Sequence, residues 1–292
     1  MRAGIIILPD ERWSAGSRRW RLAEEYGFAH AWTYDHIGWR SLVDGPWFDA
    51  VPTLTAAAQI TTRIRLGTMV ASPHFRHPVH FAREVTALDD ISRGRILLGV
   101  GAGAVGTSFD ATVFGRPVLT ARALTDRYAE FLELLDRLLR EHRVTWHGEY
   151  YAAVDARSIP GCVQSPRVPF VVAANGPRSL RLAARFGEGW VTTGGRGETA
   201  DGWWRVVADS ARRFTDALLA ADRDPSRVDR FLSLDASGTY ALSSVTAFTD
   251  AVGRAGELGF TDVVTHWPRR EDWYAGDEAV LETVATDVLP SL

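Results

Sequence analysis

An acidic and a basic side chain stand next to each other in the segment WTYDHIGW, as Asp35 and His36. They directly follow an apolar run, and a histidine is suited to proton transfer near neutral pH. The alternative is that Asp35 caps the next turn and that His36 is a surface residue. These residues alone support both interpretations equally. His266, in VVTHWPR, ends another apolar run, and we expect it to face the same site.

A second pattern is typical of anion binding. The segment PFVVAANGPRS places Pro177 at the expected first position of a helix. The free N–H groups of a helix N-terminus attract anions, and Arg178 adds positive charge beside them. A later glycine turn at 194–197 brings Arg196. The two turns predict a phosphate cradle of backbone and guanidinium groups, and ordinary helix capping with solvated arginines is the alternative.

The stretch GAGAVG at 101–106 matches the dinucleotide fingerprint G-x-G-x-x-G. The fingerprint requires a strand, a turn and a helix in immediate succession, and no convincing helix follows here at once. We therefore interpret this stretch as a glycine-lined strand end, where a flat ring system can lie against bare backbone.

Three histidines, His74, His77 and His80, have the spacing of a helical metal cluster. However, Pro78 stands between them and marks the expected helix start. No carboxylate completes a ligand set at a suitable spacing, so we expect no metal.

The composition excludes several chemistries. All 33 basic residues are arginine, so no lysine can serve a Schiff-base aldolase, a pyridoxal enzyme or a phosphate loop. The 36 acidic residues give a net charge of −3, which argues against a nucleic-acid partner. The single cysteine, Cys162, cannot form an internal disulfide, and no apolar stretch approaches the roughly 18 residues of a membrane helix. We therefore expect a cytoplasmic protein.

Eight apolar runs alternate with helical patterns. Most runs are continuous, as expected for parallel strands buried on both faces. Helix periodicity is clearest in 118–141, where Leu124, Tyr128 and Phe131 share a face. The alternation predicts an α/β fold, a (β/α)8 TIM barrel, with a doubly wound open sheet as the fallback. The runs cover 4–8, 29–34, 64–70, 95–101, 169–174, 189–194, 231–235 and 261–266.

We expect a single domain over residues 1–292, because α/β barrels of this length form one domain. The 67 residues between Gly101 and Pro169 are far more than one helix requires. The excess predicts an insertion between strands 4 and 5, at about 104–117 and 144–168. Its second part is rich in aromatic residues, glycine and proline, and predicts a hairpin over the barrel mouth.

Four ordered segments carry a family resemblance. They are AEEYGFAHAWTYDH, LTAAAQITTRIRLGTMVASPHFRHPVHFAREVTALDDISRGRILLGVGAG, VTWHGEYY and the AANGP…GEGWVTTGG block. Together they resemble the luciferase-like family of flavin- and deazaflavin-dependent oxidoreductases. The resemblance covers most of the chain and implies a (β/α)8 barrel, in agreement with the periodicity. The last block and the WTYDH turn are most similar to members that use the deazaflavin coenzyme F420.

The resemblance implies roles for individual positions. Asp35 would lie near the deazaflavin ring, and His36 matches the proton donor or base. Met69-Val70 falls where the family carries a non-prolyl cis peptide behind the ring. The other positions implied in cofactor binding surround the ring and its ribityl chain or form the phosphate-binding turn; they are Ser72, Ala102, Gly103, Ala174, Asn175, Gly176, Arg178 and Ser179.

The chain departs from the sugar-phosphate dehydrogenases of the family. Ala104 stands where they have a catalytic glutamate. The lysines that grip the sugar phosphate are absent, and Arg196 aligns with one of them. These departures imply a larger and less anionic substrate. We expect it to be lined by Trp39, Trp47, Thr193, Arg196, His266 and Trp267.

The sequence therefore predicts an F420-dependent reductase or dehydrogenase. It would transfer a hydride between the deazaflavin and a carbon or imine of a small-molecule or peptide-derived organic substrate. An FMN-dependent two-component monooxygenase is the alternative with the same fold, and a non-catalytic flavin-binding protein is the alternative of another class. The resemblance also implies a homodimer and a separate F420 or flavin reductase as cofactor supplier. We expect no nucleic-acid, membrane or metal partner.

Overall fold

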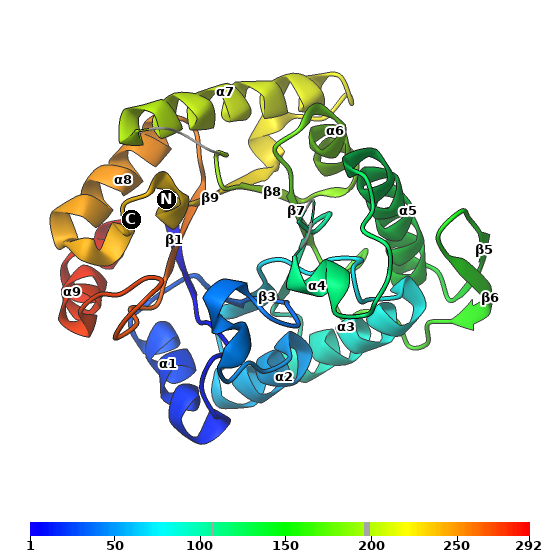
Figure 1. Ribbon diagram of the computed structural model, residues 1–292, viewed down its shortest axis with the longest axis horizontal. Helices are drawn as coiled ribbons and strands as arrows, with labels where there is room; N and C mark the ends of the chain where they lie inside the picture. The colour runs from blue at the N-terminus through cyan, green and yellow to red at the C-terminus, as the bar shows by residue number, and fades with distance from the viewer. Residues whose placement is uncertain (105, 107, 196–198) are drawn as a thin grey trace.

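Eight parallel strands close into a barrel surrounded by helices in the computed structural model of the chain (Figure 1). The structure describes residues 1–104, 106, 108–195 and 199–292. The strands pair in the order β1-β10-β9-β8-β7-β4-β3-β2, and β1 pairs with both β2 and β10. The predicted (β/α)8 barrel is confirmed. Its strands are β1 Arg2–Ile6, β2 His30–Thr33, β3 Arg65–Thr68, β4 Ile96–Val100, β7 Phe170–Ala173, β8 Gly189–Thr192, β9 Asp229–Ser233 and β10 Asp262–His266.

The strands are apolar on both faces because each face packs against a separate hydrophobic cluster. Successive side chains of a strand point to opposite sides, so Ile5 packs in the layer between barrel and helices and Ile6 packs inside the barrel. The inner cluster draws one or two residues from most strands, among them Trp32, Leu97 and Phe231. This double burial explains why the strand runs are continuous rather than alternating.

The helices follow the strands and cover the barrel. In α5, Leu124, Tyr128 and Phe131 are all buried, as the periodicity predicts, and Pro78 occupies the first turn of α3. None of the helices in the described part of the chain is long and apolar enough to cross a membrane. The helices are α1 Trp13–Glu25, α2 Ala50–Ile60, α3 Pro78–Ser92, α4 Phe109–Thr112, α5 Ala121–Arg140, α6 Pro177–Phe186, α7 Ala200–Leu219, α8 Val245–Glu257 and α9 Glu278–Thr283.

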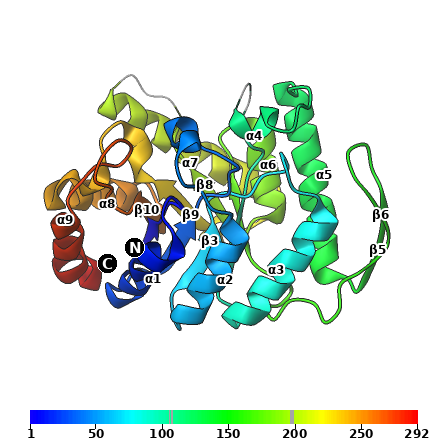
Figure 2. The ribbon, with the colours of Figure 1, turned by 60° about the horizontal axis from the view of Figure 1, so that its bottom comes forward.

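The excursion between β4 and β7 contains α4, α5 and a hairpin of β5 Arg143–His147 and β6 Ala152–Arg157. The hairpin lies on the far side of α5 from the barrel (Figures 1 and 2). Glu130 of α5 accepts the backbone N–H groups of residues 149–151 at 2.8–3.0 Å and ties the hairpin turn to the helix. The expectation that this hairpin covers the barrel mouth is therefore wrong. In the earlier part of the excursion, α4 lies on the side of the barrel where the strands end (Figure 2).

Candidate active site

The predicted site residues gather at the carboxyl ends of the barrel strands, a face that we call the barrel mouth. Loops after β2, β3, β4, β7, β8, β9 and β10 form it, at the top of Figure 2. All strands are parallel and end at this face, so residues far apart in the sequence meet here.

His36, in the loop after β2, is hydrogen-bonded to Asp110 in the first turn of α4. Nδ1 of His36 contacts Oδ2 of Asp110, and the backbone N–H of Ile37 donates to Oδ1 of the same carboxylate at 2.7 Å. Asp110 is 4% exposed, whereas the His36 side chain is 28% exposed. A carboxylate accepts, so Nδ1 carries the proton and Nε2 is free to take up or release one. This geometry is suited to acid–base chemistry.

Asp35, next to His36, forms a buried ion pair. Arg76 donates to both of its carboxylate oxygens at 2.7 Å and also donates to Glu84 at 2.7 Å. Burial raises the pKa of Asp35, and the Arg76 guanidinium opposes the rise. Because both oxygens are occupied, Asp35 ties the loops after β2 and β3 together. Its predicted roles as a second catalytic group and as a neighbour of the cofactor ring both stay predictions.

A second histidine–aspartate pair lies deeper in the mouth. His266, at the end of β10, contacts Oδ2 of Asp235 through Nδ1 at 2.6 Å. The hydroxyl of Tyr34 lies 2.8 Å from Nε2 of His266, and the Tyr274 ring stacks on the imidazole with centroids 3.5 Å apart. His266 is only 1% exposed. The expectation that His266 lines the substrate site is therefore corrected: Tyr34 and Tyr274 cover it.

The direction of these hydrogen bonds follows from the carboxylate. Asp235 accepts backbone N–H groups from Ala241 and His266, both at 2.8 Å, so it also accepts the proton on Nδ1 of His266. Burial lowers the pKa of His266, and Asp235 opposes this effect. Nε2 of the neutral ring then accepts the hydroxyl proton of Tyr34. The pair holds Tyr34 as a wall of the mouth, with its ring edge-on to His36 at 5.6 Å.

The tryptophans predicted to line the substrate separate into two groups. Trp47 donates its indole N–H to the carbonyl of His36 at 2.8 Å, and Trp39 packs against Tyr34 with centroids 5.2 Å apart. Both are half-buried at the mouth. Trp267 is 2% exposed, stacks on Tyr26 and donates to Glu278, both outside the barrel. Trp267 therefore does not line the mouth, which corrects the prediction.

The predicted cis peptide between Met69 and Val70 is present, and Ser72 is buried two residues further along. At two nearby glycines a side chain would collide with neighbouring residues. A Cβ at Gly101 would lie 2.6 Å from Val70, and one at Gly103 would lie 2.2 Å from the His74 ring. The protein's own packing therefore requires both glycines. Whether a ring also lies against their backbone stays a prediction, as do the cofactor roles of Gly103 and Ala102.

The turn between β7 and α6 starts as predicted, with Pro177 in the first turn of the helix. The Ser179 hydroxyl accepts the N–H of Gly176 at 3.2 Å, and the Asn175 side chain accepts from Thr192 at 2.6 Å. Asn175 is exposed, and the preceding Ala174 is buried. Ser179 thus caps its own helix, and the roles of this turn in cofactor binding stay predictions.

The charge of Arg178 beside this turn is already matched. Its guanidinium is ion-paired with Asp126 of α5. The predicted phosphate contact of Arg178 would therefore compete with an existing partner. Thr193, at the end of β8, is exposed at the mouth. Arg196, the other predicted arginine, lies outside the described residues.

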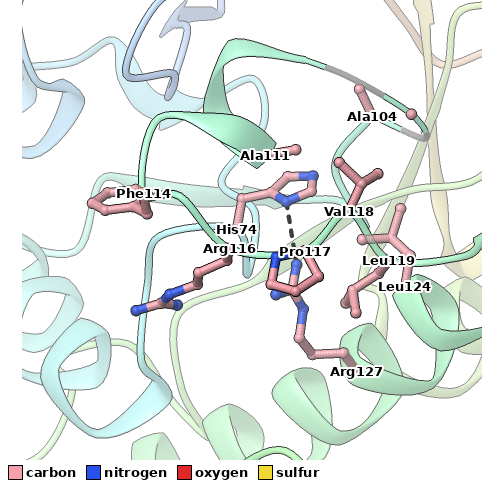
Figure 3. A pocket seen from close by; sticks show the side chains of 11 residues that line it. His74, Ala104, Ala111, Phe114, Arg116, Pro117, Val118, Leu119, Leu124 and Arg127 are labelled. Carbon is pink, nitrogen blue, oxygen red and sulfur yellow. Dashed lines mark hydrogen bonds between the residues drawn. The ribbon is translucent and has the colours of Figure 1, made fainter.

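The three clustered histidines diverge. His77 is exposed and caps α3, and His80 lies 3.5 Å from Glu84 on the outer surface. His74 instead points into a pocket beneath the loop after β4, where Nη2 of Arg127 lies 3.2 Å from its Nδ1 (Figure 3). Within the described ranges, no group of three potential ligands could hold a metal ion.

The family model for luciferase-like monooxygenases matches residues 1–270. This protein belongs to the luciferase-like family. The chain is 31% identical to an F420-dependent glucose-6-phosphate dehydrogenase of Beutenbergia cavernae, over 93% of this chain and 91% of the relative. It is 34% identical to a relative with the same name from Intrasporangium calvum, over 92% of each chain.

Solved structures support the same fold for this luciferase-like protein. The F420-dependent tetrahydromethanopterin reductase of Methanopyrus kandleri superposes with a TM-score of 0.77 at 19% identity, over 99% of each chain. An F420-dependent secondary alcohol dehydrogenase superposes with a TM-score of 0.81 at 16% identity, over 99% of this chain and 98% of that one. At these identities the likeness concerns the fold.

Several polar residues of the luciferase-like mouth escape sequence reasoning. Asp110 lies 74 residues from His36, in a stretch that carries no strand or helix periodicity, so no local pattern links them. Arg76 lies between His74 and His77, and no local pattern links it to Asp35. Asp235 could have been found, because it ends the apolar run 231–235, and Asp35 directly follows the run 29–34.

Proposed function

We propose that this luciferase-like protein is an F420-dependent oxidoreductase that moves a hydride between the deazaflavin and a carbon or imine of an organic substrate. The observation that carries the proposal is the His36–Asp110 pair, whose free imidazole nitrogen lies at the barrel mouth. The F420-dependent relatives, which align over nine-tenths of the chain, support the same cofactor class.

The residues at the mouth fit an anionic deazaflavin. Buried nitrogens of His74 and Arg127 lack hydrogen-bond partners beside the loop that carries Gly103 and Ala104, and such donors suit an anionic group. The helix N-terminus after Gly176 offers further N–H groups. A bound deazaflavin would supply the carbon that carries the hydride.

The protein's own part in the reaction is to hold the reactants and to move one proton. Asp110 fixes the His36 tautomer, so Nε2 takes up a proton when the substrate is oxidised and returns it when the substrate is reduced. Tyr34, held by the buried His266, forms the facing wall and limits the positions that a substrate can take.

The substrate that we propose is larger and less anionic than a sugar phosphate. Ala104 is exposed at the mouth and offers no carboxylate. The chain contains no lysine, and the half-buried rings of Trp39 and Trp47 present apolar surface beside His36. Organic compounds with an alcohol, carbonyl or imine carbon next to an apolar group fit these walls.

The proposal is tested by titrating the apo-protein with F420, FMN and NADPH and following cofactor fluorescence. We expect F420 to bind at least about tenfold more tightly than FMN, a difference of about 1.4 kcal/mol. Equal affinity for F420 and FMN would count against the proposal. An anaerobic assay then separates it from an FMN-dependent monooxygenase, because a hydride-transfer enzyme keeps working without oxygen and a monooxygenase stops.

A further inference from the structure

A pocket lies at the edge of the barrel mouth, between the loops after β3 and β4, the segment after α4 and the start of α5. His74 and Arg127 form its inner end, Ala104 one side, and Phe114 and Arg116 the outer side (Figure 3). Gly106 also lines the pocket. Its cavity volume is about 20 Å³, which is room for one group the size of a water molecule. Phe114 and Arg116 are exposed, so the pocket adjoins solvent on that side.

Two residues that line this pocket carry buried polar atoms without partners. Four side-chain nitrogen or oxygen atoms in the described part of the chain are buried with no hydrogen-bond partner, and two of them, His74 Nε2 and Arg127 Nε, belong to the pocket lining. Native proteins leave few such atoms unsatisfied, and a cluster of them indicates a missing ligand or water.

The pocket offers donors. Nδ1 of His74 faces Nη2 of Arg127, which can only donate, so Nδ1 accepts and the ring proton sits on Nε2. Burial and the charge of Arg127 lower the pKa of His74, which keeps the ring neutral in this form. The Ala104 carbonyl opposes that lowering but does not reach hydrogen-bond geometry with Nε2. His74 Nε2 and Arg127 Nε therefore both present N–H groups.

The positive charge of the pocket is unmatched. Among the described residues, no carboxylate lies within ion-pair distance of Arg127 or Arg116, whereas Arg178 nearby is paired with Asp126. Burial and the charge of Arg116 lower the pKa of Arg127. A water molecule would satisfy hydrogen bonds here but would bring no negative charge. An oxyanion brings both acceptors and charge.

We propose that His74, Arg127 and Arg116 form an oxyanion subsite, which takes a terminal oxygen of a phosphate or carboxylate group at the inner end and leaves the rest of the group over Arg116. This inference rests on the proposed function for the source of the anion. Ala104, which lines the pocket, directly follows Ala102 and Gly103 of the predicted cofactor site, so the charged side chain of a bound deazaflavin is one source. A free phosphate ion is the other.

The test compares cofactors that differ only in the anionic group. Purified apo-protein is titrated with F420 and with the neutral deazaflavin that carries the same ring and ribityl chain but no phosphate. Because charge-assisted hydrogen bonds are lost, we expect Arg127→Gln to weaken F420 binding roughly 10- to 100-fold and to leave the neutral analogue within about twofold. Arg116→Gln, on the exposed side, should act in the same direction by about three- to tenfold.

Arg122→Gln is the matched control, because Arg122 lies on the same helix and its side chain is 89% exposed. It removes the same charge and should change neither affinity. Inorganic phosphate distinguishes the two sources. If the subsite holds the cofactor's anion, phosphate competes with F420 and not with the neutral analogue, and Arg127→Gln abolishes the competition. If it serves a free anion, phosphate raises the melting temperature through Arg127 without displacing F420.

Two results together overturn the proposal: Arg127→Gln and Arg116→Gln both bind F420 with the affinity of Arg122→Gln, and phosphate has no effect that depends on Arg127. The pocket then holds water. Circular dichroism and thermal melting show whether Arg127→Gln folds, and the exposed Arg116→Gln keeps the test decisive if it does not. Failure of the proposed function would look different, since F420 and the neutral analogue would then both fail to bind the wild-type protein.

Discussion

Replacing Asp110 by asparagine should reverse the tautomer of His36. Oδ1 of Asp110 accepts the backbone N–H of Ile37 at 2.7 Å, and Oδ2 faces Nδ1 of His36. The backbone donor cannot move its proton, so the asparagine must keep its oxygen toward Ile37 and turn its NH₂ group toward His36. Nδ1 then has to accept, and the ring proton moves to Nε2.

Two magnitudes follow from this geometry. A hydrogen bond to a buried charged group contributes about 1.5–3 kcal/mol, and the partial exposure of His36 places the loss of unfolding free energy in Asp110→Asn at about 1–2 kcal/mol. The larger effect is chemical, because Nε2 can no longer accept a proton. Once a substrate is known, we expect kcat to fall roughly 10²- to 10⁴-fold with little change in KM.

The tautomer is measured without any substrate, from the ¹⁵N and ¹H shifts of the histidine rings in the apo-protein. The chain has 8 histidines, and the His36 signals are assigned as those absent from a His36→Gln variant. Wild-type protein should show a protonated Nδ1 and Asp110→Asn a protonated Nε2. An unchanged tautomer in Asp110→Asn would refute the argument that Asp110 determines the protonation of His36.

Three other predictions concern stability. Burial lowers the folded-state pKa of His266 below its unfolded value of about 6.5, so the unfolded chain binds the proton more readily. Urea unfolding at pH 7.5, 6.5 and 5.5 should therefore show the free energy of unfolding falling below about pH 6.5, by at most about 1.4 kcal/mol per pH unit for this group. The fall should be shallower in His266→Asn. Asp35→Asn should cost up to about 3–5 kcal/mol because the buried Arg76 loses its bidentate partner and keeps only its ion pairs with Glu84 and Asp49. Adding Arg76→Met should recover part of that loss, and strictly additive losses would contradict the ion pair. Gly101→Ala should lower the free energy of unfolding by about 1–3 kcal/mol because its Cβ would lie 2.6 Å from Val70. Gly101→Ala combined with Val70→Ala should be more stable than Gly101→Ala alone. A fully stable Gly101→Ala would show that the strand end has room for a Cβ.

The barrel itself could be predicted because its determinants are local. Each strand is buried on both faces, so the apolar run is visible without knowledge of its neighbours. Tyr128 and Phe131 follow the helix period, and Pro177 starts a helix for reasons confined to its own φ angle and missing N–H. The position of the hairpin at 143–157 was not predictable, because its place depends on Glu130 of α5.

The sequence by itself determined the fold, the family, the place of His36 at a strand end and the absence of any lysine for substrate or cofactor chemistry. The tertiary structure alone decided the partners: Asp110 for His36, Arg76 for Asp35 and Arg127 for His74, across 74, 41 and 53 residues of chain. Barrel closure brings these loops together. The sequence around each of these side chains contains no pattern that identifies its partner. A titratable residue can thus be found from its position in a motif, but its protonation is determined by the loop that packs against it.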